Sequence, residues 1–569
     1  CLQFFIDQPT KSMLREFWFP SVFIAIITLS GGRVAQITAD ETTSAALTGK
    51  FLWFSDLHLD PYYGKINAFR YQKHNRADCN GTSSLASPFG TYGCDAPLSL
   101  IDSAIQHSKS EIRNGFHPDF ILLTGDFCRH GTDDGGNNNP VAMIGKVFTD
   151  VSKSILREYP HTSIVPLLGN NDAFLDYRLT IEEVPNALLE LAADKLEGLL
   201  RDGEMETFRT GGYYSRNVGP NILLIALNTL IYSSNHSPDE THIIDPFNQF
   251  AWLEQTLTQA QTQTSPNSVK VYIVGHIPPT IGSYRKNQYW HDQYLDAYFR
   301  IIERYDDMIA AQLYGHVHSD EFRVLRYPHN ITNSNSDNKI MPPLLINGAL
   351  TPVLGNNPNF RLVKYHPEDL LITDYDTYVL SLNEDGAEPA LFNKPTWGKS
   401  DSFHDSFNVP DVSITSLQTI LTRLSSGNND LNRDNNPTMN TLLTRIQAGV
   451  PQPPCEWSCR MTWVCTFQSI THAEYRQCMD AEMGGSTIGS LEASGNGSFS
   501  SVRFAHPILT VLLGVFVCLL VVVLGVLSYR IRGKRIGYEP HNRGVAVNTD
   551  DEDPNILSDE PTIQLPPIT

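Results

Sequence analysis

A layered α/β domain is the fold class that the sequence predicts for residues 50–380. Short apolar runs recur there, namely FLWF (51–54), FILL (120–123), SIVPLL (163–168), ILLIAL (222–227), VYIV (271–274), AAQLY (310–314) and PLLIN (343–347). Helical patterns separate several of these runs, at 98–113 and at 141–156, and the first places Leu98, Ile101 and Ile105 on one face. Such alternation is typical of strands that helices bury on both sheet faces.

The region from 381 to 480 has a different pattern, helical and polar. It ends in the cysteine cluster CEWSCRMTWVCTFQSITHAEYRQC (455–478), which predicts a small disulfide-bonded helical region. Residues 481–506 are rich in Gly and Ser and are typical of a flexible linker. The segment 530–569 is polar, acidic and proline-containing, so we expect a disordered tail.

Two apolar segments predict the topology of the chain. Residues 508–527 carry no charge and are long enough to cross a bilayer, so we assign 507–529 to a transmembrane helix. The basic residues that follow, including Arg530 and Arg532, place the tail in the cytoplasm. The shorter run within 1–39 predicts a signal peptide or an N-terminal anchor. We therefore expect a single-pass membrane protein whose main domain is lumenal or extracellular, in a lysosome or vacuole or at the cell surface.

Cysteines, glycosylation sequons and charge agree with an oxidising compartment. Six of the nine cysteines fall in sequence-close sets, which favours disulfides over a thiolate metal site: Cys79 and Cys94, then Cys455, Cys459, Cys465 and Cys478. Cys128 is left over as a buried free thiol. Sequons begin at Asn80, Asn235, Asn330 and Asn496, all before the predicted span. The net charge of -20 argues against a nucleic-acid-binding surface.

Polar side chains follow five of the apolar runs. They stand in the segments Asp56-Leu57-His58, Gly125-Asp126, Gly169-Asn170, Gly275-His276 and Gly315-His316-Val317-His318. Four of these segments begin with glycine, which we interpret as a sharp backbone turn on leaving the strand. Because loops at strand ends hold the chemistry of such sheets, we expect the polar side chains to converge.

The convergent set contains more donors than one cation needs. Its members are Asp56, His58, Asp126, Asn170, His276, His316 and His318. Their number matches two adjacent divalent metal ions that share a bridging carboxylate. An imidazole-rich and thiolate-free set suits zinc, iron or manganese and disfavours calcium.

Each candidate has a simpler explanation when it is taken alone. Asp56 could cap a helix, His58 could be a core histidine, and Asn170 could be a turn residue. The pair His316 and His318 could share one strand face by chance. Five repeats of the same pattern, in one order, favour the metal site.

The motifs DLH, GDxxxH, GNND, GHIPP and GHVH resemble those of the calcineurin-like metallophosphoesterases. HLDPYYG, GCDAPLSL and the cysteine cluster are similar to the acid sphingomyelinase-like phosphodiesterase and endopolyphosphatase branch. The resemblance covers residues 50–480 and implies a layered β-sandwich flanked by helices, with zinc as the metal. It assigns one metal to Asp56, His58, Asp126 and His318, and the other to Asp126, Asn170, His276 and His316. It also implies the disulfides Cys79–Cys94, Cys455–Cys459 and Cys465–Cys478.

The two metals predict a hydrolytic mechanism. A hydroxide shared by two cations would attack phosphorus, and His130, just beyond Asp126, would protonate the leaving oxygen. Asn171 stands where most relatives have a second histidine, so its catalytic part differs from theirs, and Asp172 would orient the neighbouring loop. GNND and the Arg129-His130 pair resemble the endopolyphosphatases.

Several functions fit these features. We expect an anionic, phosphate-containing substrate, with polyphosphate first and with sphingomyelin or a nucleotide diester as alternatives. Arg129, Arg285 and Lys286 are candidate substrate contacts, while Tyr289 and Trp290 could stack on a base. The stretch SYRKNQYWHDQY (283–294) could equally be a solvated surface. An alternative of another class is an inactive, membrane-tethered binding protein, which should have lost metal ligands. The sequence retains all of them.

Overall fold

The computed structural model describes most of the chain before residue 489. The described residues are 48–65, 68, 79, 87–112, 117–132, 139–181, 185–219, 221–236, 242–262, 269–328, 339–382, 395–426 and 435–488. All of them belong to one compact unit, Cys1–Gly489. The predicted signal (1–39), membrane span (507–529) and tail (530–569) lie outside the described residues, as does most of the linker.

The first of two sheets has six strands in the order β12-β11-β10-β1-β2-β3. Their bounds are β1 Gly49–Phe54, β2 Phe120–Leu123, β3 Ser163–Pro166, β10 Asn359–Tyr365, β11 Ile372–Leu380 and β12 Trp397–Lys399. Strands β1, β2 and β3 are parallel, in a register that pairs Phe51 with Phe120 and Phe120 with Ser163. The other strands run antiparallel to their neighbours.

The second sheet also has six strands, in the order β4-β5-β6-β7-β9-β8. Their bounds are β4 Tyr214–Gly219, β5 Ile222–Ala226, β6 Lys270–Val274, β7 Ile309–Tyr314, β8 Glu321–Arg323 and β9 Leu344–Ile346. Strands β5, β6, β7 and β9 are parallel. Every apolar run noted in the sequence thus forms a strand, and the buried parallel strands explain why those runs do not alternate with polar residues.

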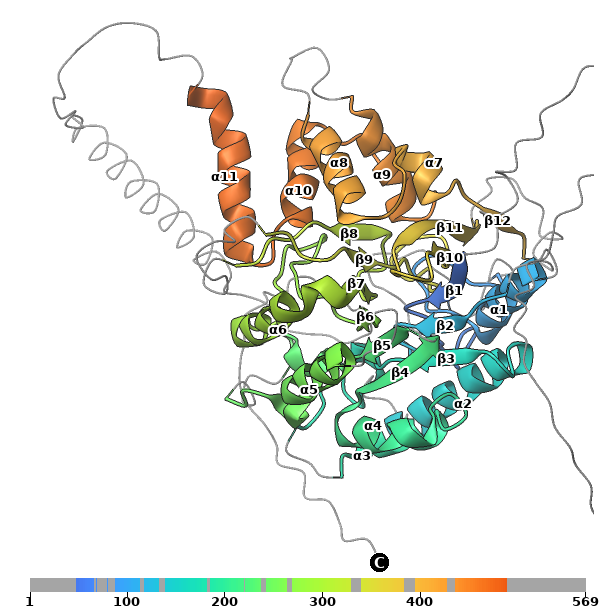
Figure 1. The fold of residues 1–569 in the computed structure, drawn as a ribbon. Coiled ribbons are helices and arrows are strands. Elements are labelled where there is room, and N and C mark those ends of the chain that lie inside the picture. The colour runs from blue at the N-terminus through green and yellow to red at the C-terminus, as the bar shows by residue number, and fades with distance from the viewer. Residues whose placement is uncertain are drawn as a thin grey trace, which may run out of the picture. The chain divides into compact units, whose positions relative to one another are not determined.

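The two sheets pack face to face. The Phe51 ring of β1 lies 6.0 Å from the Tyr272 ring of β6, and the Tyr214 hydroxyl donates to the Pro166 carbonyl at 2.9 Å. Helices cover the outer faces (Figure 1): α1 Leu98–Ile112, α2 Pro140–Glu158, α3 Ala187–Lys195, α4 Met205–Gly211, α5 Gln249–Thr262 and α6 Asp292–Tyr305. This confirms the layered β-sandwich flanked by helices.

The region 381–480 is continuous with the sandwich. Strand β12 completes the first sheet, and the helices α7 Phe403–Phe407, α8 Ile414–Ser425, α9 Pro437–Ile446, α10 Trp457–Phe467 and α11 His472–Ile488 follow. The Phe467 ring packs 4.8 Å from the Phe322 ring of β8. Helix α11 continues to Ile488, past the start that we expected for the linker.

The cysteines form the disulfide pairs that the resemblance implies. Disulfides join Cys79 to Cys94, Cys455 to Cys459 and Cys465 to Cys478. Cys128 is buried and free. Three disulfides indicate that the domain matures in an oxidising compartment.

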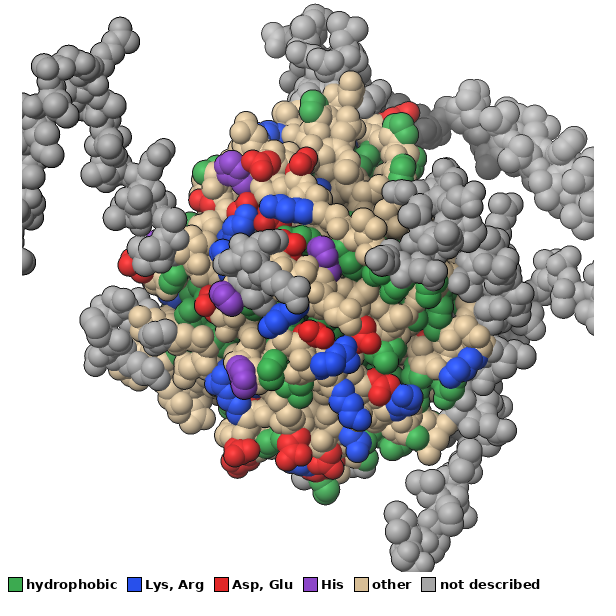
Figure 2. Space-filling model, turned by 90° about the vertical axis from the view of Figure 1, so that its right-hand side faces the viewer, with side chains coloured by type: hydrophobic (Ala, Val, Ile, Leu, Met, Phe, Trp, Pro, Cys, Tyr) green, Lys and Arg blue, Asp and Glu red, His purple; other side chains and the backbone are tan. Residues whose placement is uncertain are grey.

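Charged side chains of both signs are mixed on the surface. In Figure 2, basic and acidic side chains are interspersed over the face shown, without a large patch of either sign.

Among the described residues, no helix is both long and apolar enough for a bilayer crossing. The predicted span at 507–529 therefore stays a prediction.

Candidate metal centre

The seven candidate ligands meet at one edge of the sandwich. They follow the carboxyl ends of β1, β2, β3, β6 and β7, which belong to both sheets. Potential ligand atoms cluster within 4.8 Å in three groups: Asp56, His58 and Asp126; Asp126, His276 and His316; and His58, His130 and His318. The structure thus gathers side chains that are up to 262 residues apart, as from Asp56 to His318.

One half of the cluster surrounds His58. Its Nε2 lies 3.3 Å from Asp126 Oδ2 and 3.2 Å from His318 Nε2. His318 Nε2 in turn lies 3.4 Å from Asp56 Oδ1. All four side chains are buried.

The other half surrounds His276. Its Nε2 lies 3.2 Å from Asp126 Oδ2 and 3.1 Å from Asn170 Oδ1. The His316 ring is 5.2 Å from the His276 ring. Asp126 therefore faces both halves, as a bridging carboxylate would.

Backbone carbonyls orient the two central imidazoles. His58 Nδ1 lies 2.9 Å from the Cys128 oxygen, and His276 Nδ1 lies 2.7 Å from the Thr124 oxygen. Each Nδ1 therefore carries the proton when the ring is neutral, and each Nε2 presents its lone pair to the cluster. Asn170 is oriented similarly, because its Nδ2 donates to Asp176 at 2.9 Å and turns its oxygen inward.

The protonation states of the histidine ligands differ. Burial lowers the pKa of His58 and His318 well below the usual range, and lowers that of His316 to about 3, so these rings are neutral, which is the form that binds a metal. For His276, burial opposes the charged form, but the Asp126 carboxylate outweighs it and raises the pKa to about 9. Burial, together with the neighbouring Asp126 carboxylate, raises the pKa of Asp56 to about 7.

These residues fit two divalent cations. Two neutral imidazole nitrogens, those of His58 and His318, face each other at 3.2 Å, an arrangement that a shared cation stabilises. The donor set contains imidazole, carboxylate and amide oxygen and no thiolate, which suits zinc, iron or manganese.

The backbone at the cluster differs from our expectation about glycine. Five of the seven candidate ligands adopt left-handed conformations: Asp56 (φ 50°), His58 (43°), Asp126 (54°), His316 (73°) and His318 (61°). Among the four preceding glycines only Gly125 has a positive φ, of 85°. The ligands themselves make most of the turns, at a cost of roughly 1–3 kcal/mol each. Strain of this kind clusters at functional sites.

Asn171 and Asp172, which follow the ligand Asn170, have different roles at the cluster. Asp172 accepts hydrogen bonds from the backbone N–H groups of Asp126, Cys128 and Gly169 at 2.8–3.0 Å, so it orients the loops as predicted. The Asn171 side chain donates to Asp126 Oδ2 at 2.9 Å. Asn171 therefore positions the Asp126 carboxylate, while its Oδ1 is buried and has no hydrogen-bond partner among the described residues.

His130 lies beside the cluster. Its ring stacks on His58 at 4.0 Å, and its Nδ1 lies 2.9 Å from Asp95 Oδ1. Burial opposes the charged form, but the Asp95 carboxylate outweighs it and raises the pKa of His130. The ring can thus hold a proton next to the candidate metal site, as a general acid must.

The comparisons with known proteins agree with this geometry. A model of the calcineurin-like phosphoesterases matches residues 49–320. Acid sphingomyelinase-like phosphodiesterase 3b of Homo sapiens is 30% identical over 445 residues, which cover 76% of this chain and 90% of that protein. The chain belongs to the acid sphingomyelinase-like phosphodiesterase family. It is a metal-dependent phosphoester hydrolase.

Other relatives of the chain carry different names. A cyclic GMP-AMP phosphodiesterase of Mus musculus is 28% identical over 450 residues, which cover 76% of this chain and 92% of that protein. Sphingomyelinase phosphodiesterase D of Dictyostelium discoideum is 29% identical over 415 residues, covering 69% and 88%. The family and the clustered metal ligands support an enzyme over the alternative of an inactive binding protein.

The three candidate substrate contacts lie in different environments. Arg129 is 1% exposed and lies 3.5 Å from Asp60, with its Nε donating to the His130 carbonyl. Lys286 turns toward the C-terminal helices, where its Nζ is 5.5 Å from the Trp463 ring. Arg285 is exposed. A direct substrate contact by any of the three stays a prediction.

The two candidates for base stacking, Tyr289 and Trp290, lie in different environments. The Tyr289 ring lies 4.9 Å from the His316 ring, at the edge of the cluster. Trp290 is fully buried and donates to the Ile277 carbonyl at 3.0 Å. Our expectation that Trp290 stacks on a base is wrong, because its ring is part of the core.

Sequence reasoning missed two residues at the site, Asp95 and Tyr177. Asp95 follows Cys94 in the GCDAPLSL motif, which we used only for the resemblance. The Tyr177 hydroxyl lies 3.5 Å from His316 Nε2, and its φ of 60° is unusual for a tyrosine. Neither contact has a sequence pattern of its own.

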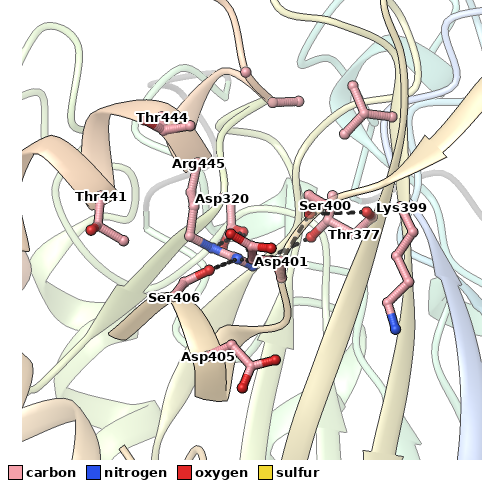
Figure 3. A pocket seen from close by; sticks show the side chains of 13 residues that line it. Asp320, Thr377, Lys399, Ser400, Asp401, Asp405, Ser406, Thr441, Thr444 and Arg445 are labelled. Atoms are coloured by element: carbon pink, nitrogen blue, oxygen red, sulfur yellow. Dashed lines mark hydrogen bonds and ion pairs between the residues drawn. The ribbon is translucent and has the colours of Figure 1, made fainter. Parts of the chain in front are cut away.

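The protein also has a cavity that is separate from the candidate metal cluster (Figure 3). Its volume is about 590 Å³, and its walls come from β11, β12, α7 and α9. Arg445 spans it and binds Asp320 Oδ2 through Nη2 at 3.0 Å. None of the candidate metal ligands lines this cavity.

Gly169 offers a test of the close packing at the cluster. A Cβ at this position would lie 2.7 Å from Asp126 Cγ and would displace the shared carboxylate. We expect Gly169→Ala to lower kcat/KM by roughly 10²-fold or more, the loss expected from misplacing a reacting group by about 1 Å. Gly203→Ala is the matched control, because nothing lies within 4 Å of its added methyl group. Equal activity of both variants would contradict the assignment of Asp126.

Proposed function

We propose that the chain hydrolyses phosphodiesters with two zinc ions outside the cytoplasm. One zinc would be held by Asp56, His58, Asp126 and His318, and the other by Asp126, Asn170, His276 and His316. The observation that carries this proposal is the position of Asp126 Oδ2, 3.3 Å from His58 Nε2 and 3.2 Å from His276 Nε2. When bound, the zinc ions would supply Lewis acidity and lower the pKa of water at the site.

The residues of the chain then have separate roles. Asn171 holds Asp126 in place, and Asp172 holds the backbone of the loops that carry the ligands. His130 donates its proton to the leaving oxygen, and Asp95 fixes the His130 ring by hydrogen bonding to Nδ1. The other ring nitrogen of His130, Nε2, is the atom that delivers the proton.

A nucleotide-like diester is the substrate that we infer. Tyr177 and Tyr289 flank His316 and offer aromatic surface for a base. Polyphosphate, our first expectation, would need several Lys or Arg side chains that are available to bind its phosphates. Arg129 is instead paired with Asp60, and Lys286 packs on Trp463. The relative named cyclic GMP-AMP phosphodiesterase supports the same choice.

The cellular setting belongs to the proposal as well. Three disulfides support a lumenal or extracellular domain. The uncharged segment 508–527 and the basic residues after it support a single membrane anchor.

A substrate panel tests the proposal. The purified chain would be assayed on a cyclic dinucleotide, a nucleoside triphosphate, long-chain polyphosphate and sphingomyelin, with and without a chelator. We expect the highest kcat/KM on the nucleotide substrates, loss of all turnover with the chelator, and recovery with added zinc. Tyr289→Leu should raise KM for the nucleotides and leave polyphosphate unaffected. A higher kcat/KM on polyphosphate than on either nucleotide would contradict the inferred substrate class.

A further inference from the structure

The turn 233–236 joins the two loops that carry the active-site tyrosines. The Ser234 N–H donates to the Tyr289 carbonyl at 2.8 Å, and the Ser234 hydroxyl donates to the Gln288 carbonyl at 2.6 Å. On its other side, His236 Nε2 lies 2.9 Å from the Leu179 oxygen. The turn is therefore held at the rim of the site by both loops.

Asn235 stands at the tip of this turn. It is exposed, and its backbone N–H donates to the Ser233 hydroxyl at 3.2 Å. The preceding residue, Ser234, binds the Tyr289 carbonyl, and the Tyr289 ring lies 4.9 Å from the His316 ring. Asn235 thus stands next to the residue that ties this turn to the rim of the candidate metal cluster.

Asn235 is also the first residue of the sequon Asn235-His236-Ser237. An exposed asparagine in a turn is accessible to the enzyme that transfers N-linked glycans. The three disulfides independently indicate maturation in the compartment where this transfer occurs. The other sequons, at Asn80, Asn330 and Asn496, lie outside the described residues.

We propose that Asn235 carries an N-linked glycan that limits the active site to soluble substrates and keeps it from lipids in a bilayer. In the modification, the Asn235 amide nitrogen bonds to the anomeric carbon of an oligosaccharide carried on a lipid diphosphate. The lipid diphosphate leaves, and the amide loses one proton. The effect on substrates rests on the proposed function, whereas glycan occupancy does not.

The position of the glycan explains the selectivity. Its first sugar grows from the turn whose Ser234 binds the loop of Tyr289, and the Tyr289 ring lies 4.9 Å from the His316 ring. A small diester in solution can approach past a bulky hydrated chain. A membrane surface cannot, since the whole bilayer would have to come within reach of His316.

Three variants, expressed in a secretory pathway, test the proposal. Ser237→Ala removes the sequon and keeps Asn235, Ser237→Thr keeps the sequon, and Asn235→Gln removes the acceptor itself. Mass spectrometry of the Asn235 peptide should find a glycan in the native chain and in Ser237→Thr, and none in the other two. An unmodified Asn235 in the native chain would overturn the proposal, whether or not the enzyme is active.

Kinetics test the consequence of the glycan. A soluble nitrophenyl phosphodiester would be compared with the same diester attached to a lipid in phosphatidylcholine vesicles. We expect Ser237→Ala to raise kcat/KM on the vesicles several-fold and to leave the soluble diester unchanged, with Ser237→Thr matching the native chain. Equal ratios of the two substrates in all variants would overturn the role in selectivity. Absence of turnover on both substrates would count against the proposed function, because occupancy is measured separately.

Discussion

Replacing Asp126 with asparagine should remove most of the activity, by about 10³-fold or more in kcat/KM. The change keeps the shape of the side chain and removes the charge that both metals would share. Lewis-acid stabilisation by metals is worth several kcal/mol, and each 1.36 kcal/mol corresponds to a factor of ten in rate. The zinc content per chain, measured by mass spectrometry, should fall in parallel.

Asp202→Asn is the matched control for this variant, because Asp202 is an exposed aspartate outside the cluster. Circular dichroism would establish that both variants are folded. If Asp126→Asn retained full zinc and near-native turnover, Asp126 could not be the bridging ligand.

Replacing His130 with alanine should have the second largest effect, and the effect should depend on the leaving group. For a substrate that releases a sugar hydroxyl, we expect kcat to fall by about 10²–10⁴-fold, the usual contribution of a general acid. For a nitrophenyl diester we expect little change, since nitrophenolate leaves without a proton. Rates on the two substrates give the measurement.

Two variants sharpen this test. Asp95→Asn removes the carboxylate that fixes the His130 ring, and it should show the same dependence on leaving group with a smaller loss, about 10–100-fold. His404→Ala is the control, because His404 is an exposed histidine on α7. An equal loss on both leaving groups would show that His130 supports the metal site and does not donate a proton.

The architecture of the α/β domain could be predicted because its parallel strands are buried on both faces. The runs at 51–54, 120–123 and 271–274 are continuous in apolar residues for that reason, and each forms a strand. The meeting of Asp56 and Asp126 followed from the same topology, because they come after the parallel strands β1 and β2 of one sheet. His276 comes after β6 of the other sheet and joins them because the two sheets pack face to face.

Other features of the site depend on long-range packing that the local sequence does not express. Asp95 reaches His130 only because the chain after the Cys79–Cys94 disulfide folds back on the loop after β2. Arg129 has the chemistry of a phosphate contact, but its partner Asp60 is 69 residues away in the chain. The packing of Trp290 against Tyr232 is also non-local, because the two residues are 58 positions apart in the chain.

The backbone conformation of the ligand residues also could not be predicted from local sequence preferences. Left-handed conformations are normally assigned to glycine, and the sequence places glycines just before four of the polar segments. Asp56, His58 and Asp126 adopt that conformation instead. Local preference is overridden here because the surrounding sandwich holds the strand ends in place.

X-ray anomalous scattering at the zinc edge, from crystals of the purified protein, tests the central claim most directly. The account predicts two peaks about 3.5–4 Å apart. Both peaks should lie about 2.0–2.2 Å from an oxygen of Asp126, one beside His58 and the other beside His276. A single peak, or peaks that do not share Asp126, would contradict the account.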